Sequence, residues 1–247
     1  TDELCQRIYR YRLLFASPGG GIPISGLEPL MQPRGVYVLL QFARDNDIHT
    51  AIDTSGFLGV RCSDAMMRNL NLVLLDIKSG VPEVYKRTTN QELGPTLEFA
   101  QRLGVAQVPV WVRFVLVPGL TDDRDNIERV AEIASSIPSL ERVEVLPFHQ
   151  MGRDKWEALG FDYKLEETRP PTAEATEQAR DIFRRRRIAT YCHALLTQRC
   201  NSVCGNCSGE IIYLPRACAC TLKCHIQITG KRSPCHLSLD AWFEDDF

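Results

Sequence analysis

The sequence predicts an α/β protein in which parallel strands alternate with helices, as in a parallel sheet or a (β/α) barrel. Segments with the composition of strands and segments with helical spacing of apolar residues alternate five times between residues 2 and 188. Residues 72–77, LVLLDI, form an almost unbroken apolar run, which is typical of a parallel strand covered on both faces. Polar residues follow each strand-like segment, so we expect one edge of the sheet to carry the chemistry.

The first half of the chain begins with a helix and continues with three strand-like segments. Leu4, Ile8, Tyr11 and Phe15 have helical spacing and lie behind an acidic first turn. Pro33 marks the start of another helix, because its fixed φ suits the first helical position. The expected helices here are 2–15, 33–45 and 63–70, and the expected strands are 22–24, 49–53 and 72–77.

The second half repeats the same alternation. Asp122, Asp123 and Asp125 lie where negative charge favours a helix N-terminus, and Thr172 is the expected N-cap of the last helix. A loop through residues 150–171 precedes that helix. The expected strands here are 110–117 and 143–146, and the expected helices are 94–104, 122–137 and 173–187.

The composition is that of an ordinary globular chain. A chain of 247 residues can form one sizeable core, and 44% hydrophobic with 24% charged residues is a typical balance. A net charge of −2 indicates no broad attraction to nucleic acid or anionic membrane. No apolar run approaches the ~20 residues of a membrane helix. We therefore expect neither a nucleic-acid nor a membrane partner, and a start at Thr1 without methionine suggests a fragment.

Residues 19–30, GGGIPISGLEPL, are the first candidate for a ligand site. Glycines let the backbone approach a small molecule closely, because no Cβ intervenes. Glu28 follows the strand and is placed to accept hydrogen bonds from a ligand's ammonium group. Taken alone, this pattern also fits an ordinary turn with a solvated glutamate.

The other strand ends strengthen the case for one ligand site. They carry Asp53, Asp76 with Lys78, Arg113 and His149. Each has a simple structural explanation when taken singly; Arg113, for example, would pair with a helix carboxylate. In a (β/α) barrel, however, the carboxyl ends of the strands converge, so together they predict a polar site.

Several longer motifs resemble the pyruvate formate-lyase activating enzymes of the radical S-adenosylmethionine superfamily. They are GGGIPISGLEPL, DIHTAIDTSGF, LVLLDIK, TLEFA, VWVRFVLVPGLTDD and VEVLPFHQMGRDKWEALG, and the similarity runs from residue 1 to about residue 188. The resemblance implies a partial (β/α)6 barrel that binds a [4Fe–4S] cluster and S-adenosylmethionine. It implies a cytoplasmic radical oxidoreductase whose 5′-deoxyadenosyl radical abstracts hydrogen from a glycine of a glycyl radical enzyme. The implied electron donor is a flavodoxin or a ferredoxin.

The resemblance also implies roles for residues that match the family's motifs. Gly26 and Glu28 match the motif that holds the methionyl ammonium, and Lys78 matches the lysine that pairs with the methionyl carboxylate. Arg113 and His149 match polar residues that face S-adenosylmethionine. A zwitterionic ligand needs opposite charges at its two poles, so this assignment is chemically consistent.

A monovalent cation beside the methionyl carboxylate is a further implication. Asp53, Thr54 and Asp76 match the positions linked to that cation, and Asp53 belongs also to the expected S-adenosylmethionine site. No residue stands out as a catalytic acid or base.

The sequence departs from the family's pattern in two places. Leu27 replaces the second glycine of the family's Gly-Gly-Glu motif, where a side chain would crowd the ligand. The family's cluster motif, Cys-x3-Cys-x2-Cys, is absent from residues 1–188, because Cys5 and Cys62 lack that spacing. The resemblance implies that this motif and the first barrel strand belong before Thr1, so the barrel is expected to lack its first strand.

Residues 189–247 are expected to form a separate, irregular or disordered, cysteine-rich tail after the barrel of residues 1–188. Cys200, Cys204 and Cys207 have the spacing of the missing cluster motif. Zinc is an equally open alternative for these three cysteines together with the tail's other ligands. Those other candidates are Cys218, Cys220, Cys224, His225 and His236.

Three functions remain open from the sequence. The favoured one is an activase that generates a glycyl radical on pyruvate formate-lyase or a related enzyme, present here as an inactive fragment or a divergent chain. The second is a Schiff-base lyase that uses Lys78, which would require a desolvated lysine. The third is a non-catalytic barrel remnant with a metal-binding tail.

Overall fold

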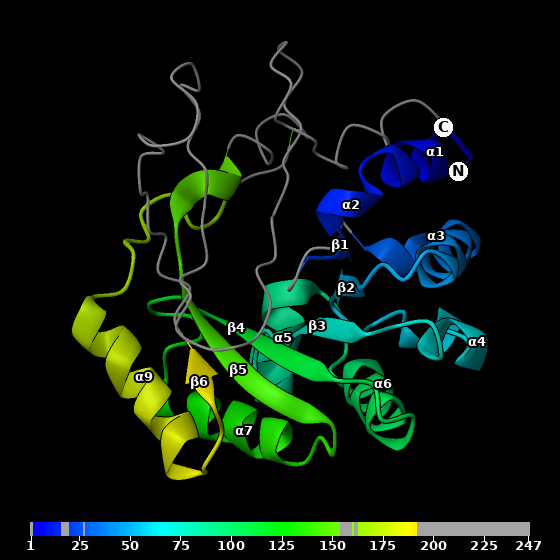
Figure 1. The fold of residues 1–247 in the computed structure, drawn as a ribbon. Coiled ribbons are helices and arrows are strands. Elements are labelled where there is room, and N and C mark those ends of the chain that lie inside the picture. The colour runs from blue at the N-terminus through cyan, green and yellow to red at the C-terminus, as the bar shows by residue number, and fades with distance from the viewer. Residues whose placement is uncertain (1, 16–19, 27, 154–159, 161–162, 192–247) are drawn as a thin grey trace, which may run out of the picture. The chain divides into compact units, whose positions relative to one another are not determined.

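The computed structural model describes residues 2–15, 20–26, 28–153, 160 and 163–191 (Figure 1). Its strands form a six-stranded sheet in the order β1-β2-β3-β4-β5-β6, with helices between successive strands, so the predicted α/β class is confirmed. The strands are β1 Ile22–Ile24, β2 Thr50–Thr54, β3 Leu72–Asp76, β4 Val110–Leu116, β5 Leu140–Pro147 and β6 Thr190–Tyr191. The α-helices are α1 Asp2–Arg10, α2 Arg12–Phe15, α3 Pro33–Asp45, α4 Asp64–Met67, α5 Pro82–Thr89, α6 Gly94–Val105, α7 Arg124–Ser135 and α9 Ala173–Arg185.

The described chain divides into two compact units. The first contains residues up to 54 together with 61–73, and the second contains 55–60 and 74–191. Strand β3 therefore begins in the first unit and ends in the second. This division does not test the predicted boundary between residues 188 and 189.

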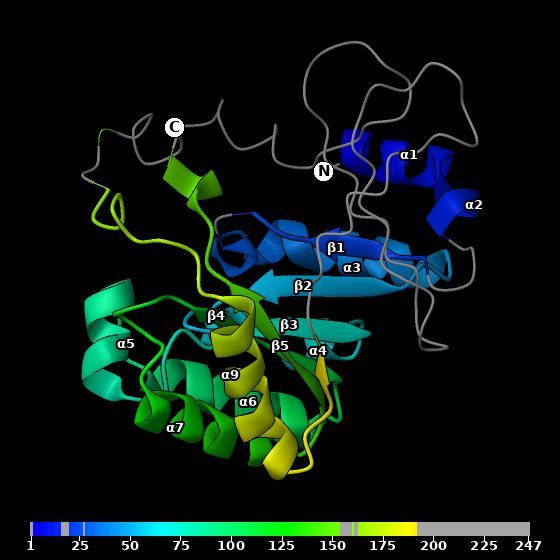
Figure 2. The ribbon, with the colours of Figure 1, turned by 90° about the vertical axis from the view of Figure 1, so that its left-hand side faces the viewer.

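The first unit is built around β1 and β2. The two strands are parallel, with Ile22 opposite Thr50 and Ile24 opposite Ile52. At Gly21 an added Cβ would lie 2.7 Å from the carbonyl oxygen of His49, so only glycine allows this close entry into β1. Helix α3 contacts β2 and α4, and Figure 2 shows it running alongside the two strands.

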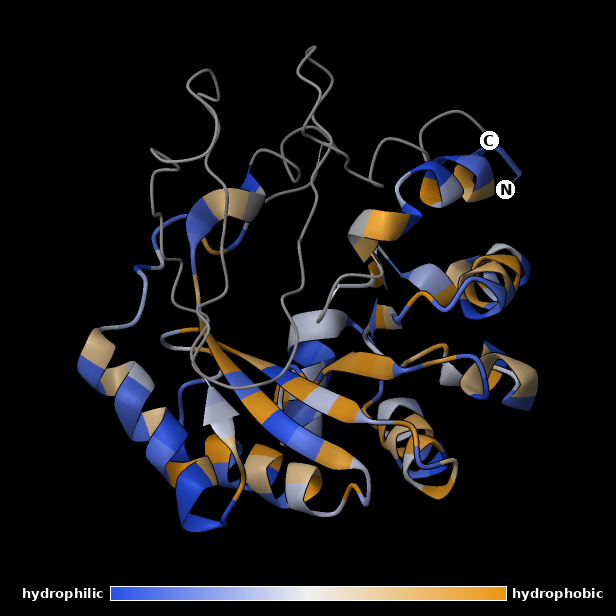
Figure 3. Ribbon diagram, viewed as in Figure 1, coloured by the Kyte–Doolittle hydropathy of each residue, from blue (hydrophilic) through white to orange (hydrophobic). Residues whose placement is uncertain are grey.

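The second unit is built around β4 and β5, which are parallel over their whole length. Helices α7 and α9 contact each other and β5, and they lie side by side in Figure 1. The rings of Phe114 on β4 and Phe183 on α9 have centroids 6.2 Å apart. Polar and apolar residues alternate along β5, visible as blue and orange bands in Figure 3. Such alternation indicates that the two faces of the strand meet different surroundings.

The two faces of β4 and β5 differ sharply in chemistry. Val110, Val112, Phe114 and Leu116 are 0–1% exposed and form the face that carries the Phe114–Phe183 contact. Because side chains alternate along a strand, Trp111, Arg113 and Val115 point to the opposite face. On that second face the register pairs them with Arg142, Glu144 and Leu146 respectively.

Most predicted elements are confirmed with shifts of a few residues at their ends. Helix α3 has the predicted bounds, and Thr172 caps α9 by accepting a hydrogen bond from the amide of Ala175 at 3.1 Å. Asp123 is the N-cap of α7 and accepts from the amides of Asp125 and Asn126.

Three elements differ from the prediction. The single helix expected over 2–15 is divided at Tyr11 into α1 and α2. Helix α5 was not predicted, because it is short and only its Tyr85 is buried. Strand β6 was placed in the irregular tail; its two residues pair with Val143 and Glu144 of β5, which a sequence pattern cannot show. The predicted character of the rest of the tail lies outside the described residues.

Among the described residues, no helix is both long enough and apolar enough to cross a bilayer.

Candidate functional site

Glu28 is the organising residue of the first unit's candidate site. It is the N-cap of the short helix η1, Pro29–Met31, and its Oε1 accepts a hydrogen bond from the amide of Leu30 at 3.1 Å. The same oxygen accepts a second hydrogen bond from the hydroxyl of Thr54 at 2.6 Å. Two neutral donors from different segments thus position this carboxylate at the end of β2.

The turn that carries Glu28 depends on glycine. Gly26 has a φ of 150°, which residues with a Cβ rarely adopt, and it is exposed. Leu27, which is expected to crowd the ligand, lies outside the described residues. Gly26 leaves the backbone accessible two residues before the carboxylate.

Asp53 and Thr54 end β2 with side chains on opposite faces. Thr54 is 3% exposed and its hydroxyl contacts Glu28, whereas Asp53 is half-buried. Successive side chains on a strand point to opposite faces. The two side chains therefore point to opposite faces of the strand.

Asp76 and Lys78 form the second unit's candidate site. Asp76 ends β3, and its Oδ2 lies 2.8 Å from the Lys78 ammonium nitrogen. Their side chains are 21% and 31% exposed, so the pair remains open to a ligand from solvent. The structure brings these two predicted residues together.

Arg113 belongs to a row of charged side chains on one face of β4 and β5. Its register partner is Glu144, and its carbonyl oxygen accepts a hydrogen bond from the amide of Ile77 at 3.0 Å. Glu144 also binds Arg142, with Nη2 and Oε1 2.5 Å apart, and their side chains are only 7% and 17% exposed. The Arg142 guanidinium lies over the ring of Trp111, 3.2 Å from its centroid.

Sequence reasoning missed Glu144 and Arg142. The sequence signal for these residues is a pair of charges two positions apart in ERVEVL. This spacing places both side chains on the same face of an otherwise apolar strand. The alternation alone is also typical of a strand with one face in water. Only the register with Trp111 and Arg113 shows that this face is largely buried.

His149 follows β5 and is exposed. Its Nδ1 accepts a hydrogen bond from the amide of Met151 at 3.3 Å, which makes it the N-cap of the short helix η3, Gln150–Gly152. In the neutral imidazole this bond places the proton on Nε2, so the ring presents an N–H donor outward.

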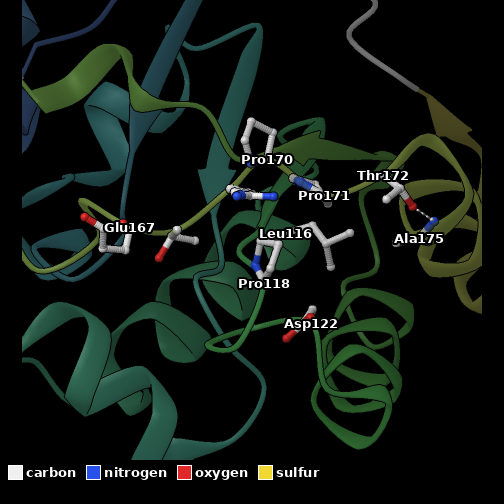
Figure 4. Close-up of a pocket in the computed structure, with 10 residues that line it drawn as sticks. Leu116, Pro118, Asp122, Glu167, Pro170, Pro171, Thr172 and Ala175 are labelled. Carbon is white, nitrogen blue, oxygen red and sulfur yellow. Dashed lines mark hydrogen bonds between the residues drawn. The ribbon is translucent and has the colours of Figure 1, made fainter.

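A pocket of about 500 Å³ lies within the second unit, at the carboxyl end of β4 (Figure 4). None of the predicted site residues lines it. Its walls are Leu116, Pro118, Asp122, Glu167, Thr168, Arg169, Pro170, Pro171, Thr172 and Ala175. Pro118 and Asp122 belong to the segment after β4. The pocket therefore adjoins the end of β4, but the charged Arg113 of that strand does not line it.

The described cysteines do not fit an iron–sulfur cluster. Cys5 and Cys62 are both buried, and burial raises the pKa of the Cys5 thiol, which disfavours the thiolate that binds metal. Within the residues that the structure covers, no three His, Cys, Asp or Glu side chains form a metal-binding group. Cys200, Cys204 and Cys207 lie outside the described residues.

Comparison with known proteins defines the class of this fold. The sequence profile described as "Radical SAM superfamily" matches residues 6–131. Solved chains agree at the level of fold: Streptococcus suis SuiB bound to S-adenosylmethionine superposes with a TM-score of 0.54 at 13% identity, covering 76% of this chain and 41% of that one. The expected fold of the radical S-adenosylmethionine type is thereby confirmed.

Closer relatives narrow the class to a family. The pyruvate formate-lyase-activating enzyme of Staphylococcus epidermidis is 37% identical over 185 residues, which cover 72% of this chain and 74% of the relative. The Staphylococcus aureus (strain USA300) enzyme of the same name is 36% identical over the same shares of both chains. A crystal structure of a domain of the Bacteroides vulgatus enzyme has a TM-score of 0.59 at 26% identity, covering 70% of this chain and 99% of that one. The chain belongs to the radical SAM superfamily and, within it, to the pyruvate formate-lyase-activating enzymes. Membership of this superfamily implies the use of S-adenosylmethionine and a [4Fe–4S] cluster.

Proposed function

We infer that this protein is an activase that generates a glycyl radical on pyruvate formate-lyase or a related glycyl radical enzyme by reductive cleavage of S-adenosylmethionine. The supporting observation is the presence of two charged groups at strand ends, Glu28 with Thr54 and Asp76 with Lys78, in a chain of this family. A cytoplasmic location and an electron donor of the flavodoxin or ferredoxin class are proposed from the family resemblance.

The two charged groups suit the two poles of an amino acid. Glu28 is proposed to accept hydrogen bonds from the methionyl ammonium, because Leu30 and Thr54 already hold its Oε1 in place. Gly26 leaves room for the ligand beside the backbone. Lys78 is proposed to bind the methionyl carboxylate from its partly exposed position.

A monovalent cation is proposed beside that carboxylate. Asp53 and Asp76 offer carboxylate oxygens, and Thr54 offers its hydroxyl and carbonyl oxygens, because a hydroxyl that donates its proton to Glu28 keeps its lone pairs. Oxygen ligands suit a hard cation. A cation near Asp76 compensates its charge when Lys78 turns towards the ligand.

Arg113 and His149 are proposed to contact other parts of S-adenosylmethionine. Arg113 supplies a fork of N–H donors from the charged face of β4, and His149 presents its Nε2 side. Both side chains are proposed to donate hydrogen bonds to polar atoms of the ligand and to take no part in bond making or breaking. Their role is therefore to orient S-adenosylmethionine.

No residue in the described ranges is proposed as a ligand of the cluster. Cys200, Cys204 and Cys207 are proposed as candidates on their spacing alone, for iron–sulfur or for zinc. A Schiff-base lyase is disfavoured, because the Lys78 ammonium is bound to Asp76 and a nucleophilic lysine must be neutral.

The test is formation of the radical on the partner enzyme. The protein, loaded anaerobically with iron and sulfide, is mixed with pyruvate formate-lyase, S-adenosylmethionine and a reductant, and the sample is read by electron paramagnetic resonance. We expect a glycyl radical signal that is absent when the partner's radical glycine is replaced by alanine. A sample with bound cluster and S-adenosylmethionine but no signal contradicts the proposal.

The same assay decides the role of the tail cysteines. If Cys204 is a cluster ligand, Cys204→Ala abolishes the signal and lowers the bound iron. A Cys204→Ala variant with full iron content and signal excludes that candidate. Cys218→Ala, which lies outside the Cys-x3-Cys-x2-Cys spacing, is the control.

A further inference from the structure

Asn126, on the first turn of α7, connects the segments that follow β3 and β4. The side chain is buried, with the residue 2% exposed. Its Oδ1 accepts hydrogen bonds from the Ser79 hydroxyl at 2.7 Å and from the Gly80 amide at 2.9 Å. Its Nδ2 donates to the carbonyl oxygen of Thr121 at 2.7 Å. One amide side chain thus joins two strand-end segments through three hydrogen bonds.

The segment after β3 is held closely by this arrangement. Ser79 is 0% exposed, and the Val81 amide donates to its hydroxyl oxygen at 3.0 Å. At Gly80 an added Cβ would lie 2.5 Å from the amide nitrogen of Val130 on α7. The backbone directly after Lys78 therefore packs against α7 with no room to move towards it.

The segment after β4 is fixed at the other end of the same amide. Thr121 is 1% exposed; its hydroxyl donates to the Val115 carbonyl oxygen and accepts from the Val117 amide, both at 2.8 Å. Asn126 therefore holds the Lys78 segment against a part of the chain that is itself fixed to β4.

We propose that Asn126 is a positioning residue for Lys78 and sets the affinity of the site for the ligand's carboxylate. The proposal rests on the proposed function, in which Lys78 binds the methionyl carboxylate. The Lys78 side chain is long and 31% exposed, so its ammonium can occupy many positions unless its backbone is fixed. The hydrogen bonds of Asn126 begin one residue after Lys78 and limit those positions, which lowers the entropy lost on binding.

The experiment measures S-adenosylmethionine binding by calorimetry and stability by chemical denaturation on the same samples. Asn126→Ala is expected to raise the dissociation constant about tenfold, the scale of a lost buried hydrogen-bonding group. Ile127→Ala is the matched control, because Ile127 is the next residue of α7 and is 4% exposed. It is expected to lower stability while leaving the dissociation constant within about twofold.

A double-mutant cycle with Lys78→Met separates positioning from general damage. If Asn126 acts through Lys78, Asn126→Ala has no further effect on binding in the Lys78→Met background. An equal further loss in that background overturns the proposal, and so does a loss of affinity in Ile127→Ala as large as that in Asn126→Ala.

Failure of the proposal is distinguishable from failure of the proposed function. If Lys78→Met binds S-adenosylmethionine like the parent, the role of Lys78 is wrong and the positioning role falls with it. If Lys78→Met weakens binding and Asn126→Ala does not, only the positioning role is overturned.

If Asn126→Ala does not fold, the same binding measurements are made on Ser79→Ala. This variant removes one donor to Asn126 and leaves the bond from the Gly80 amide. We expect a rise of about threefold in the dissociation constant that disappears in the Lys78→Met background, and an unchanged dissociation constant overturns the proposal.

Discussion

The two units position their charged residues in different ways. In the first, the Glu28 carboxylate accepts hydrogen bonds from a backbone amide and a hydroxyl, which are neutral donors. In the second, charges bind opposite charges: Lys78 binds Asp76, and Arg142 binds Glu144. Neutral donors fix a carboxylate and preserve its charge for a ligand, whereas an ion pair compensates charge within the protein.

This difference bears on how each unit is expected to meet its ligand. In the first unit, hydrogen bonds from Leu30 and Thr54 already hold the Glu28 carboxylate in place for the proposed contact with an ammonium group. In the proposed complex, Lys78 exchanges part of its contact with Asp76 for the ligand's carboxylate, and the proposed cation then compensates the charge of Asp76. The Glu28 carboxylate is therefore held by hydrogen bonds to the side chain itself. For Lys78, it is the backbone of the following residues that Asn126 holds.

The largest effect is expected from breaking the buried ion pair of the second unit. Glu144→Gln leaves the guanidinium of Arg142 buried without its counter-charge, so the free energy of unfolding falls by about 3–5 kcal/mol. Urea denaturation followed by circular dichroism measures it. Glu166→Gln is the control, because its pair with Arg153 is about half-exposed and is worth about 0–1 kcal/mol. Equal losses in both variants contradict the importance of burial.

The next effect concerns the charges proposed to bind S-adenosylmethionine. Glu28→Ala and Lys78→Ala each remove the counter-charge of one pole of the ligand, which costs about 1.5–3 kcal/mol, or tenfold or more in affinity. Calorimetry measures the dissociation constants, with Glu83→Ala, an exposed carboxylate on α5, as the control. Parent-like binding by both variants would remove the support for this site.

A smaller effect tests the neutral donor in the first unit. Thr54→Val keeps the shape of the side chain and removes the hydroxyl that donates to Glu28, so binding weakens by about 0.5–1.5 kcal/mol. Thr88→Val is the matched control, since its hydroxyl donates to the Val84 carbonyl oxygen on an exposed face of α5. If Thr54→Val binds as well as Thr88→Val, the hydroxyl does not position the carboxylate.

The smallest effect is expected at an exposed ion pair on α9. Hydrogen bonding from Arg184 holds the pKa of Glu177 below its usual value of 4.5. A lowered folded-state pKa contributes stability above the unfolded-state value, and that contribution is lost as the pH falls through the folded-state value. In Arg184→Ala the pKa of Glu177 rises, which carboxyl chemical shifts in an NMR titration measure. An unchanged titration shows that Arg184 does not act on Glu177 in solution.

Much of the fold and part of the site were readable from the sequence. Apolar runs and helical spacing predicted β1 to β5 and α3, α6, α7 and α9, because these elements bury a continuous face. The cap Thr172 was also predicted, and Asp122, Asp123 and Asp125 were expected near a helix N-terminus, since both signals depend on a few neighbouring residues. The position of Glu28, Asp76 and Lys78 after predicted strands already indicated them as candidate site residues.

The tertiary structure decided which side chains those residues meet. Glu28 and Thr54 are separated by 26 residues, and Ser79 and Asn126 by 47, so no local pattern links them. The burial of Glu144 depends on its register with β4, and β6 exists only because β5 offers an open edge for two residues. Local sequence determines what a segment can form by itself, whereas hydrogen bonds and ion pairs between distant segments arise only when the sheet brings them together.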